Sequence, residues 1–232
     1  MGIQTLANVS FAGWIARTLE TKRPTSVDRR KTAPSSLNGN GRARTDQVAL
    51  SDLAMAATDV QPETMAHAHR AADTARQIAS AMSLPESMVD TISAGALLHD
   101  IGKSQIPAAI LDKPGKLSDS EWDQIKQHPD IGYQMLRDVP GLEEVAAIVR
   151  HHHERYDGSG YPARLAGESI PLGARIIAVS DAFDAMRSER SYKAALPLNE
   201  AVAELRQHAG KQFDPVVVDA FLEQVVLPVS SQ

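Results

Sequence analysis

Residue types that bind metal ions recur at wide intervals along this chain of 232 residues. They are His67, His99, Asp100, His128, His152, His153 and Asp181. Imidazole nitrogens and carboxylate oxygens form a ligand set that suits iron, manganese or zinc. The chain has no cysteine, so thiolate ligands, thiolate nucleophiles and disulfides are excluded. The residue types therefore predict a metal site of nitrogen and oxygen ligands, and their number favours more than one ion.

Two pairs of candidate ligands are adjacent in sequence, which restricts where they can lie. Neighbouring residues on a regular helix diverge by about 100°. His99 and Asp100 can therefore serve one cluster only near a helix end or between two ions. The same restriction applies to His152 and His153. A position between two ions would suit a bridging carboxylate from Asp100.

The local sequence supports the candidates unequally. The pair at 99–100 ends the apolar run 94–98, where a buried charge is costly unless it has a partner or a function. The pair at 152–153 precedes a glycine-rich loop, whereas His67 and Asp181 are supported only by their spacing with the others. The other histidines are expected to be surface or hydrogen-bonded residues: His69, His151 and His208.

Asp184 leaves two interpretations open. It follows Asp181 by three positions, so it either orients a ligand side chain or forms an ordinary helix salt bridge.

Helical periodicity predicts the elements that must position these side chains. Two runs repeat apolar residues every three or four positions: Leu142, Val145, Ala146 and Val149, then Leu198, Ala201, Val202 and Leu205. Ser118 with Glu121 predicts a capping box, and Asp214 before Pro215 predicts a capped helix start. Glycines and prolines punctuate residues 156–171, which predicts a loop. We expect an all-α bundle, because no alternating pattern is long enough for a sheet.

Charge is distributed unevenly. Residues 1–50 have eight basic and three acidic residues, a net charge of +5 in a chain of net charge −5, which leaves about −10 for the remainder. Such an acidic body disfavours nonspecific nucleic-acid binding and suits cation binding.

The chain is expected to divide into an extension at 1–45 and a domain at 46–232. Residues 21–45 have the composition of a flexible linker. Residues 5–20 form either an amphipathic helix that touches a membrane surface or partner, or a frayed end. Arg17 and Glu20 interrupt their apolar residues, so no transmembrane segment is predicted. The absence of cysteine fits a cytoplasmic location.

Two motifs resemble those of a known family. HDIGK at 99–103 and HHERYDGSGYP at 152–162 are similar to the two signatures of the bacterial HD-GYP family, in the HD superfamily of metal-dependent phosphohydrolases. The similarity covers roughly residues 60–225 and includes three further segments: Glu63 to His67, SDAFDAMRSERSYK at 180–193 and QFDP at 212–215. The resemblance implies an HD-superfamily helical bundle, here with a flexible N-terminal extension.

The resemblance also implies a metal centre of two or three divalent ions, iron or manganese. The metal ligands that it implies are His67, His99, Asp100, His128, His152, His153 and Asp181. Glu63 lies at the position where some members of the family have a carboxylate that helps hold a third ion. The alternative is an exposed glutamate at a helix start. Asp100 and Lys103 would be catalytic. Lys103 matches the lysine expected near the scissile phosphate or the bridging water, and its alternative is a surface lysine.

Four residues are candidates for substrate binding. Gly160 permits a turn that would bring Tyr161 over a bound base or phosphate, although this loop could instead cover the metals or dock a protein. Arg190 and Lys193 would share a helix face, if the helix continues this far, and hold the nonscissile phosphate. Ordinary solvated charge is their alternative role.

The activity implied by the resemblance is hydrolysis of cyclic di-GMP to pGpG, with a second cleavage to GMP left open. The alternatives are an HD hydrolase of another cyclic dinucleotide or nucleotide, and a non-catalytic protein that binds cyclic di-GMP or docks a partner protein. A diguanylate cyclase (GGDEF) partner and a homodimer are also expected. Ser104-Gln105 and Ser191 depart from the family pattern at the rim of the substrate site, and they remove no predicted ligand.

Overall fold

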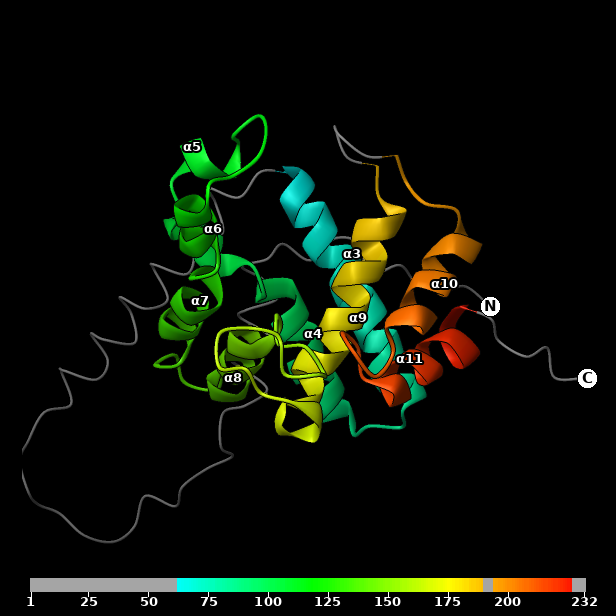
Figure 1. The fold of residues 1–232 in the computed structure, drawn as a ribbon. Coiled ribbons are helices and arrows are strands. Elements are labelled where there is room, and N and C mark those ends of the chain that lie inside the picture. The colour runs from blue at the N-terminus through cyan, green and yellow to red at the C-terminus, as the bar shows by residue number, and fades with distance from the viewer. Residues whose placement is uncertain (1–61, 190–193, 227–232) are drawn as a thin grey trace, which may run out of the picture.

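The computed structural model describes residues 62–189 and 194–226, which form a helical bundle (Figure 1). Its α-helices are α3 (Pro62–Ala81), α4 (Glu86–Leu98), α5 (Ala108–Leu111), α6 (Asp119–Ile125), α7 (His128–Leu136), α8 (Glu143–His151), α9 (Leu172–Arg187), α10 (Leu198–His208) and α11 (Pro215–Phe221). The other helical segments are η1 (Ile101–Gln105), η2 (Gly167–Ser169) and η3 (Leu222–Val226). Within the described ranges, β structure is limited to one bridge between Ala209 and Phe213. The all-α prediction is confirmed.

Two helices begin as their capping residues predict. Ser118 Oγ accepts the amide of Glu121 at 3.3 Å, and Glu121 Oε2 accepts the amide of Ser118 at 2.7 Å, which completes a capping box on α6. Asp214 Oδ1 accepts the amide of Val216 at 2.9 Å and caps α11, whose first residue is Pro215.

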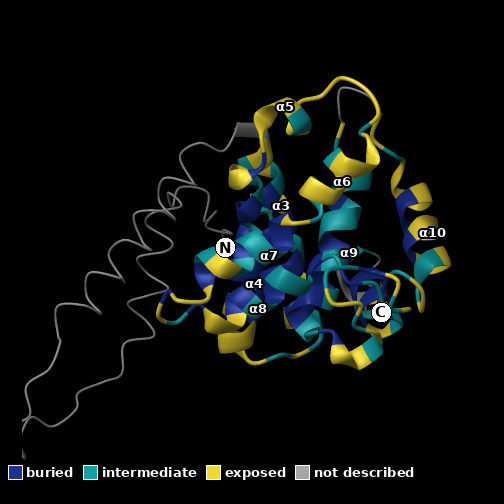
Figure 2. Ribbon diagram, turned by 60° about the vertical axis from the view of Figure 1, so that its left-hand side comes forward, coloured by how far each residue is buried: buried dark blue, intermediate teal, exposed yellow. Residues whose placement is uncertain are grey.

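The core has two parts that share α4. One part lies among α3, α4, α9, α10 and α11 and includes Ile78, Ile92, Ile177, Leu205 and Phe221. The other lies among α4, α7 and α8 and includes Leu98, Leu136, Leu142, Val145 and Val149. Figure 2 shows the buried residues gathered in the interior of the bundle. α4 contributes Ile92 to the first part and Leu98 to the second, and His99 and Asp100 directly follow its carboxyl end.

The periodic apolar residues are buried with one exception. Leu142, Val145, Ala146 and Val149 on α8 and its N-terminal cap are buried, as are Ala201, Val202 and Leu205 on α10. Leu198 lies in α10 as the helical periodicity predicts, but the residue is 41% exposed. Leu198 is the first residue of α10 and is not buried against the core cluster that holds the rest of that helix's apolar face.

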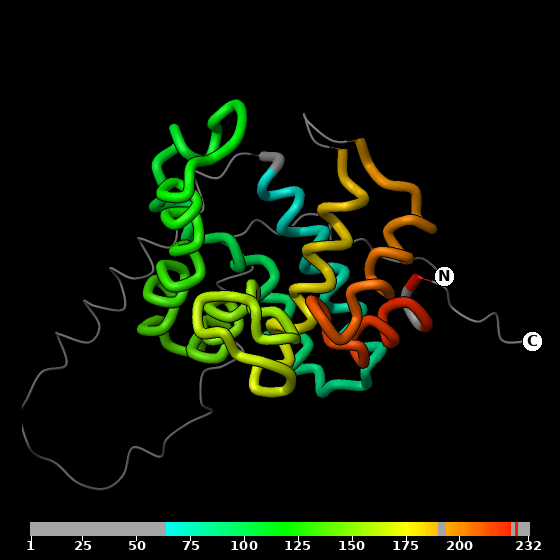
Figure 3. The backbone as a smooth tube through the Cα atoms, viewed as in Figure 1, coloured from blue at the N-terminus to red at the C-terminus, as the bar shows by residue number. Residues whose placement is uncertain are grey.

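The predicted loop is confirmed, since η2 is the only helical segment between α8 and α9. Its base lies beside the segment that precedes α11 (Figure 3). The amide of Tyr156 donates to Gln212 O at 3.2 Å, and the amide of Asp157 donates to Lys211 O at 2.8 Å. The loop is therefore joined to the carboxyl-terminal part of the bundle.

Residues 1–61 lie outside the described part of the structure. The predicted helix at 5–20, the linker at 21–45 and the domain boundary after residue 45 thus remain predictions. Among the helices that the structure describes, none is long and apolar enough to cross a membrane.

Candidate metal centre

Helix ends bring the predicted ligands together. His99 and Asp100 directly follow α4, and His152 and His153 directly follow α8. Both adjacent pairs thus lie at helix ends, one of the two arrangements that the geometry allowed. His128 is the first residue of α7, while His67 and Asp181 lie within α3 and α9.

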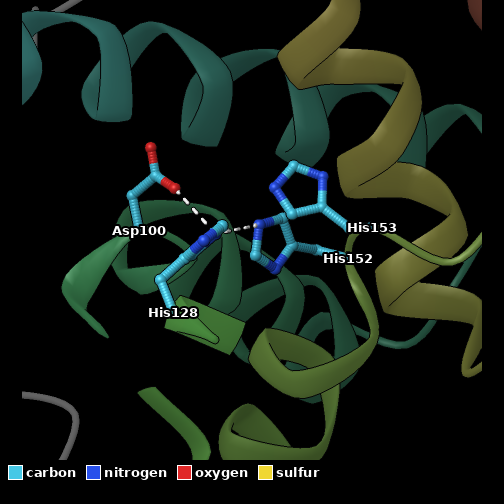
Figure 4. Close-up of side chains that lie close together, drawn as sticks. All are labelled: Asp100, His128, His152 and His153. Carbon is cyan, nitrogen blue, oxygen red and sulfur yellow. Dashed lines mark hydrogen bonds and ion pairs between the residues drawn. The ribbon is translucent and has the colours of Figure 1, made fainter. Parts of the chain in front are cut away.

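Two groups of ligand atoms form one cluster, and they share Asp100. In each group the ligand atoms lie within 4.8 Å of one another: Asp100, His128, His152 and His153 in the first, His67, His99 and Asp100 in the second. Figure 4 shows the first group, with the Asp100 carboxylate pointing toward the ring of His128. Asp181 joins the second group through an oxygen 3.1 Å from His67 Nε2. The structure therefore brings together all seven ligands predicted from their spacing.

The carboxylate of Asp100 has the environment of a metal ligand. Its Oδ1 is buried without a hydrogen bond, 3.3 Å from His128 Nε2, and its Oδ2 is 3.4 Å from His99 Nε2. Burial alone would raise the pKa of Asp100, but the nearby His99, Lys103 and His128 together hold this pKa well below its usual value. A buried, ionised oxygen without a donor is costly, so a cation at this position would be favourable.

Three histidines have their ring nitrogens fixed by backbone carbonyls. A carbonyl only accepts hydrogen bonds, so Nδ1 carries the proton and Nε2 of the neutral ring presents a lone pair to the cluster. The Nδ1–O distance is 2.7 Å in each case: His99 to Ala96, His128 to Ile125 and His152 to Val149. The Nε2 atoms of His128 and His152 face each other at 3.3 Å. Facing acceptors favour a cation between them, so the residues fit a divalent metal.

His67 lies between two carboxylates on α9. Its Nε2 is 3.1 Å from Asp181 Oδ1, and its Nδ1 is 2.6 Å from Asp184 Oδ2. The hydrogen bond to Asp181 has the largest effect, and together with the bond to Asp184 it raises the pKa of His67 from 6.5 to about 9. Burial alone would lower this pKa. The carboxylate of Asp184 also accepts two hydrogen bonds from Arg70, one from Nε at 2.6 Å and one from Nη2 at 3.0 Å. Asp184 thus contacts a predicted ligand, and its salt bridge joins α3 to α9 rather than lying within one helix.

The predicted catalytic lysine lies at the cluster. Lys103 Nζ donates to Asp100 Oδ2 at 2.8 Å. The preceding turn packs closely on α7: a Cβ atom at Gly102 would lie 2.0 Å from the carbonyl oxygen of His128. Only glycine permits this approach, which brings Asp100 to His128.

The glycine-tyrosine-proline loop also reaches the cluster. The ring centroid of Tyr161 is 4.9 Å from that of His153, and the amide of Tyr161 donates to His153 O at 3.3 Å. A Cβ atom at Gly160 would lie 2.3 Å from the amide nitrogen of Arg155. Burial, with the charges of Asp100 and Asp181, raises the pKa of Tyr161, so its hydroxyl is protonated at neutral pH.

Three predicted site residues cannot be placed. The side chain of Glu63, and residues Arg190 and Lys193, lie outside the described residues. The helix that Arg190 and Lys193 were expected to continue ends earlier, since α9 stops at Arg187 and Ser188 is extended. A helix face on α9 therefore does not unite them.

The remaining histidines agree with their prediction. His69 is exposed, His151 Nδ1 is 3.5 Å from Glu154 Oε1, and His208 Nε2 is 3.5 Å from Glu204 Oε2. Sequence reasoning missed Arg70, the partner of Asp184, and it gave no role to the buried Glu154. The signal available in the sequence was the position of this carboxylate directly after the candidate ligands His152 and His153.

A model of the HD domain family matches residues 52–217. The chain belongs to this family. This HD domain is 46% identical over 175 residues to the cyclic di-GMP phosphodiesterase response regulator RpfG of Xanthomonas campestris, with 75% of this chain and 46% of that protein covered. It is 41% identical over 174 residues to 3'3'-cGAMP-specific phosphodiesterase 2 of Vibrio cholerae, with 74% of this chain and 33% of that protein covered.

Among solved structures, the HD domain is similar to Bd1817, a HDG"Y"P protein from Bdellovibrio bacteriovorus. The TM-score is 0.56 at 20% identity, with 79% of this chain and 63% of that chain covered. This likeness supports the fold. The chain spans less than half the length of the two curated relatives. Together with the two motifs, the similarities confirm the predicted membership of the HD-GYP family.

Proposed function

We propose that this HD domain is a metal-dependent phosphodiesterase that hydrolyses cyclic di-GMP to pGpG or, by a second cleavage, to GMP. The observation that carries the proposal is the shared Asp100 carboxylate, which joins two groups of histidines beside Lys103. The name of the relative with 46% identity supports cyclic di-GMP as the substrate.

The cluster would hold two divalent ions, with Glu63 as a candidate ligand for a third. The proposed ligands are His67, His99, Asp100, His128, His152, His153 and Asp181. Iron or manganese is proposed, because imidazole with carboxylate suits these metals. When bound, such ions would supply Lewis acidity to a water and to the phosphodiester.

The other residues of the site would bind and orient the substrate. The Lys103 ammonium, 2.8 Å from Asp100, would stabilise negative charge that develops on the phosphoryl oxygens. Tyr161 presents a neutral hydroxyl and an aromatic face beside His153, so it would contact a base or a phosphate. We further propose that Arg190 and Lys193 hold the nonscissile phosphate.

Another cyclic dinucleotide is the second candidate substrate. The similarity to a 3'3'-cGAMP-specific phosphodiesterase favours it, because 41% identity is close to the value for the cyclic di-GMP relative. A panel of cyclic dinucleotides at equal concentration distinguishes the two. If the chain turned over 3'3'-cGAMP faster than cyclic di-GMP, 3'3'-cGAMP would become the proposed substrate.

The remaining expectations rest on the resemblance to the HD-GYP family. We propose a GGDEF-domain partner, a homodimer and a cytoplasmic location in a bacterium. We also propose that residues 1–45 form an extension to a domain at 46–232. Light scattering of the full chain tests the dimer, and a monomer at all concentrations would contradict it.

The first test of the function uses the full chain purified without oxygen. Elemental analysis gives the metal content, and chromatography follows the products from cyclic di-GMP. We expect two or more metal ions per chain and the appearance of pGpG or GMP. Asp100→Asn keeps the side-chain size and should lower both metal content and rate, the rate by at least ~100-fold.

Asp112→Asn is the matched control, because Asp112 is an exposed carboxylate directly after α5. It should change neither the metal content nor the rate. The proposed function fails if the folded, metal-loaded wild type leaves every cyclic dinucleotide intact under both reducing and oxidising conditions.

A further inference from the structure

Glu154 is an enclosed carboxylate beside the candidate metal centre. Its side chain is 0% exposed. Oε1 accepts the amide of Ala163 at 2.7 Å, and Oε2 accepts the amide of Leu165 at 3.1 Å. A buried carboxylate is costly unless hydrogen bonds compensate its lost hydration. The two backbone amides supply that compensation, so the carboxylate and this stretch of loop hold each other in place.

The position of Glu154 in the chain connects these amides to the cluster. It directly follows His152 and His153, so one short segment presents two candidate ligands and binds the loop. Gly160 packs against the same segment, because a Cβ atom there would lie 2.6 Å from the Cα atom of Glu154. Along the chain, Tyr161 lies between Gly160, which makes this close contact, and the two amides bound by Glu154.

The ring of Tyr161 is placed by these attachments. Its amide donates to His153 O at 3.3 Å, and its ring is inclined by 30° to that of His153. The hydrogen bonds of Tyr156 and Asp157 to residues 211–212 secure the base of the loop. They lie before Tyr161 in the chain, whereas Glu154 secures the backbone that follows it. The backbone after Tyr161 is also held further on, where the amide of Gly167 donates to Tyr156 O at 2.9 Å. Glu154 therefore supplies the attachment nearest to Tyr161 on this side.

We propose that Glu154 is a positioning residue that acts on the substrate through Tyr161. By binding the amides of Ala163 and Leu165, its carboxylate keeps the Tyr161 ring beside His153 and over the place where the cyclic dinucleotide binds. The inference rests on the proposed function, because it takes Tyr161 as a contact to the substrate. It adds a residue whose own atoms are enclosed and do not reach the substrate.

Glu154→Gln tests the anchoring directly. Glutamine has the same size, but its amide nitrogen is a donor and would face the N–H of Ala163 or Leu165, so one hydrogen bond is lost. We expect hydrogen exchange at the amides of residues 163 and 165 to accelerate at least ~10-fold. The metal content and the circular dichroism should stay as in the wild type. Glu144→Gln is the matched control, since Glu144 is exposed on the first turn of α8.

A double-mutant cycle tests whether Glu154 acts through Tyr161. Glu154→Gln alone should lower kcat/KM for cyclic di-GMP by about 10-fold or more, because misplacement of a substrate-binding group is costly. In a Tyr161→Ala background the same change should lower kcat/KM by less than ~3-fold, since the group being positioned is already gone.

Each other outcome has a distinct meaning. Unchanged hydrogen exchange at 163 and 165 would overturn the anchoring, and equal losses of kcat/KM with and without the Tyr161 ring would overturn action through Tyr161. A wild type that hydrolyses no cyclic dinucleotide would contradict the proposed function instead. Hydrogen exchange would still decide whether Glu154 holds the loop.

Discussion

The metal-free chain should lose stability as the pH rises through the titration of His67. Hydrogen bonds to Asp181 and Asp184 raise the pKa of His67 from 6.5 to about 9. A tenfold change in proton affinity is about 1.4 kcal/mol, so this shift corresponds to at most about 3 kcal/mol of stability. The folded pKa lies above the unfolded value of 6.5. The stabilisation is therefore complete below pH 6.5 and is lost as the pH rises through about 9.

The assay is urea unfolding of the wild type and of His67→Gln with a chelator present. Comparison of the two proteins is necessary, because Asp100 and Asp181 also raise the pKa of His99 despite its burial. Between about pH 6.5 and about pH 9.5 the wild type should lose about 2–3 kcal/mol relative to the variant. A constant difference in unfolding free energy over this range would refute the assigned pairing of His67 with the carboxylates of α9.

The same proton should compete with metal. Ligation by His67 requires a deprotonated Nε2, so metal binding near neutral pH must release the Nε2 proton that Asp181 accepts, while Nδ1 keeps its proton toward Asp184. The metal affinity should therefore rise by up to about tenfold per pH unit until the pH approaches the pKa of about 9. Competition with a chelator of known affinity measures it, and a pH-independent affinity would contradict ligation by His67.

Two further predictions concern carboxylates outside the proposed ligand set. Asp184→Asn should lower metal affinity by ~10–100-fold, because the ring of His67 loses its charged acceptor, and an unchanged result in chelator competition would remove the orienting role. Asp214→Ala should lower the free energy of unfolding by ~3–5 kcal/mol, because the half-buried Arg175 loses its carboxylate partner and α11 loses its cap. Urea unfolding measures the loss. Ser118→Ala, which removes the exposed cap of α6, is the comparison and should lower the free energy of unfolding by only ~1 kcal/mol.

The helices and the ligand types could be predicted because both depend on local sequence. An apolar residue every third or fourth position must face the core, as Val145 and Val149 do. Adjacent ligands such as His152 and His153 can meet at one cluster from a helix end, and that is where they lie. The spacing also predicted that Asp100 could bridge, which agrees with its place in both ligand groups.

The carboxylates that support the site were harder to predict, because their partners are distant in sequence or belong to the backbone. Asp184 binds His67, which is 117 positions away, and spacing within α9 gives no sign of that contact. Glu154 binds amides of the loop, and a backbone amide has no residue-specific trace in the sequence. Leu198 shows what a helical pattern leaves open, since it belongs to α10 as predicted but is the first residue of the helix and remains exposed.

Helix ends explain both the position and the protonation of the ligand histidines. The last carbonyls of an α-helix have no partner within the helix. The three carbonyls that bind histidine Nδ1 atoms all belong to last turns, those of Ala96 in α4, Ile125 in α6 and Val149 in α8. A histidine three positions later satisfies such a carbonyl and turns its Nε2 lone pair toward the cluster. The spacing that ends the helix thus also selects the tautomer that can bind a metal.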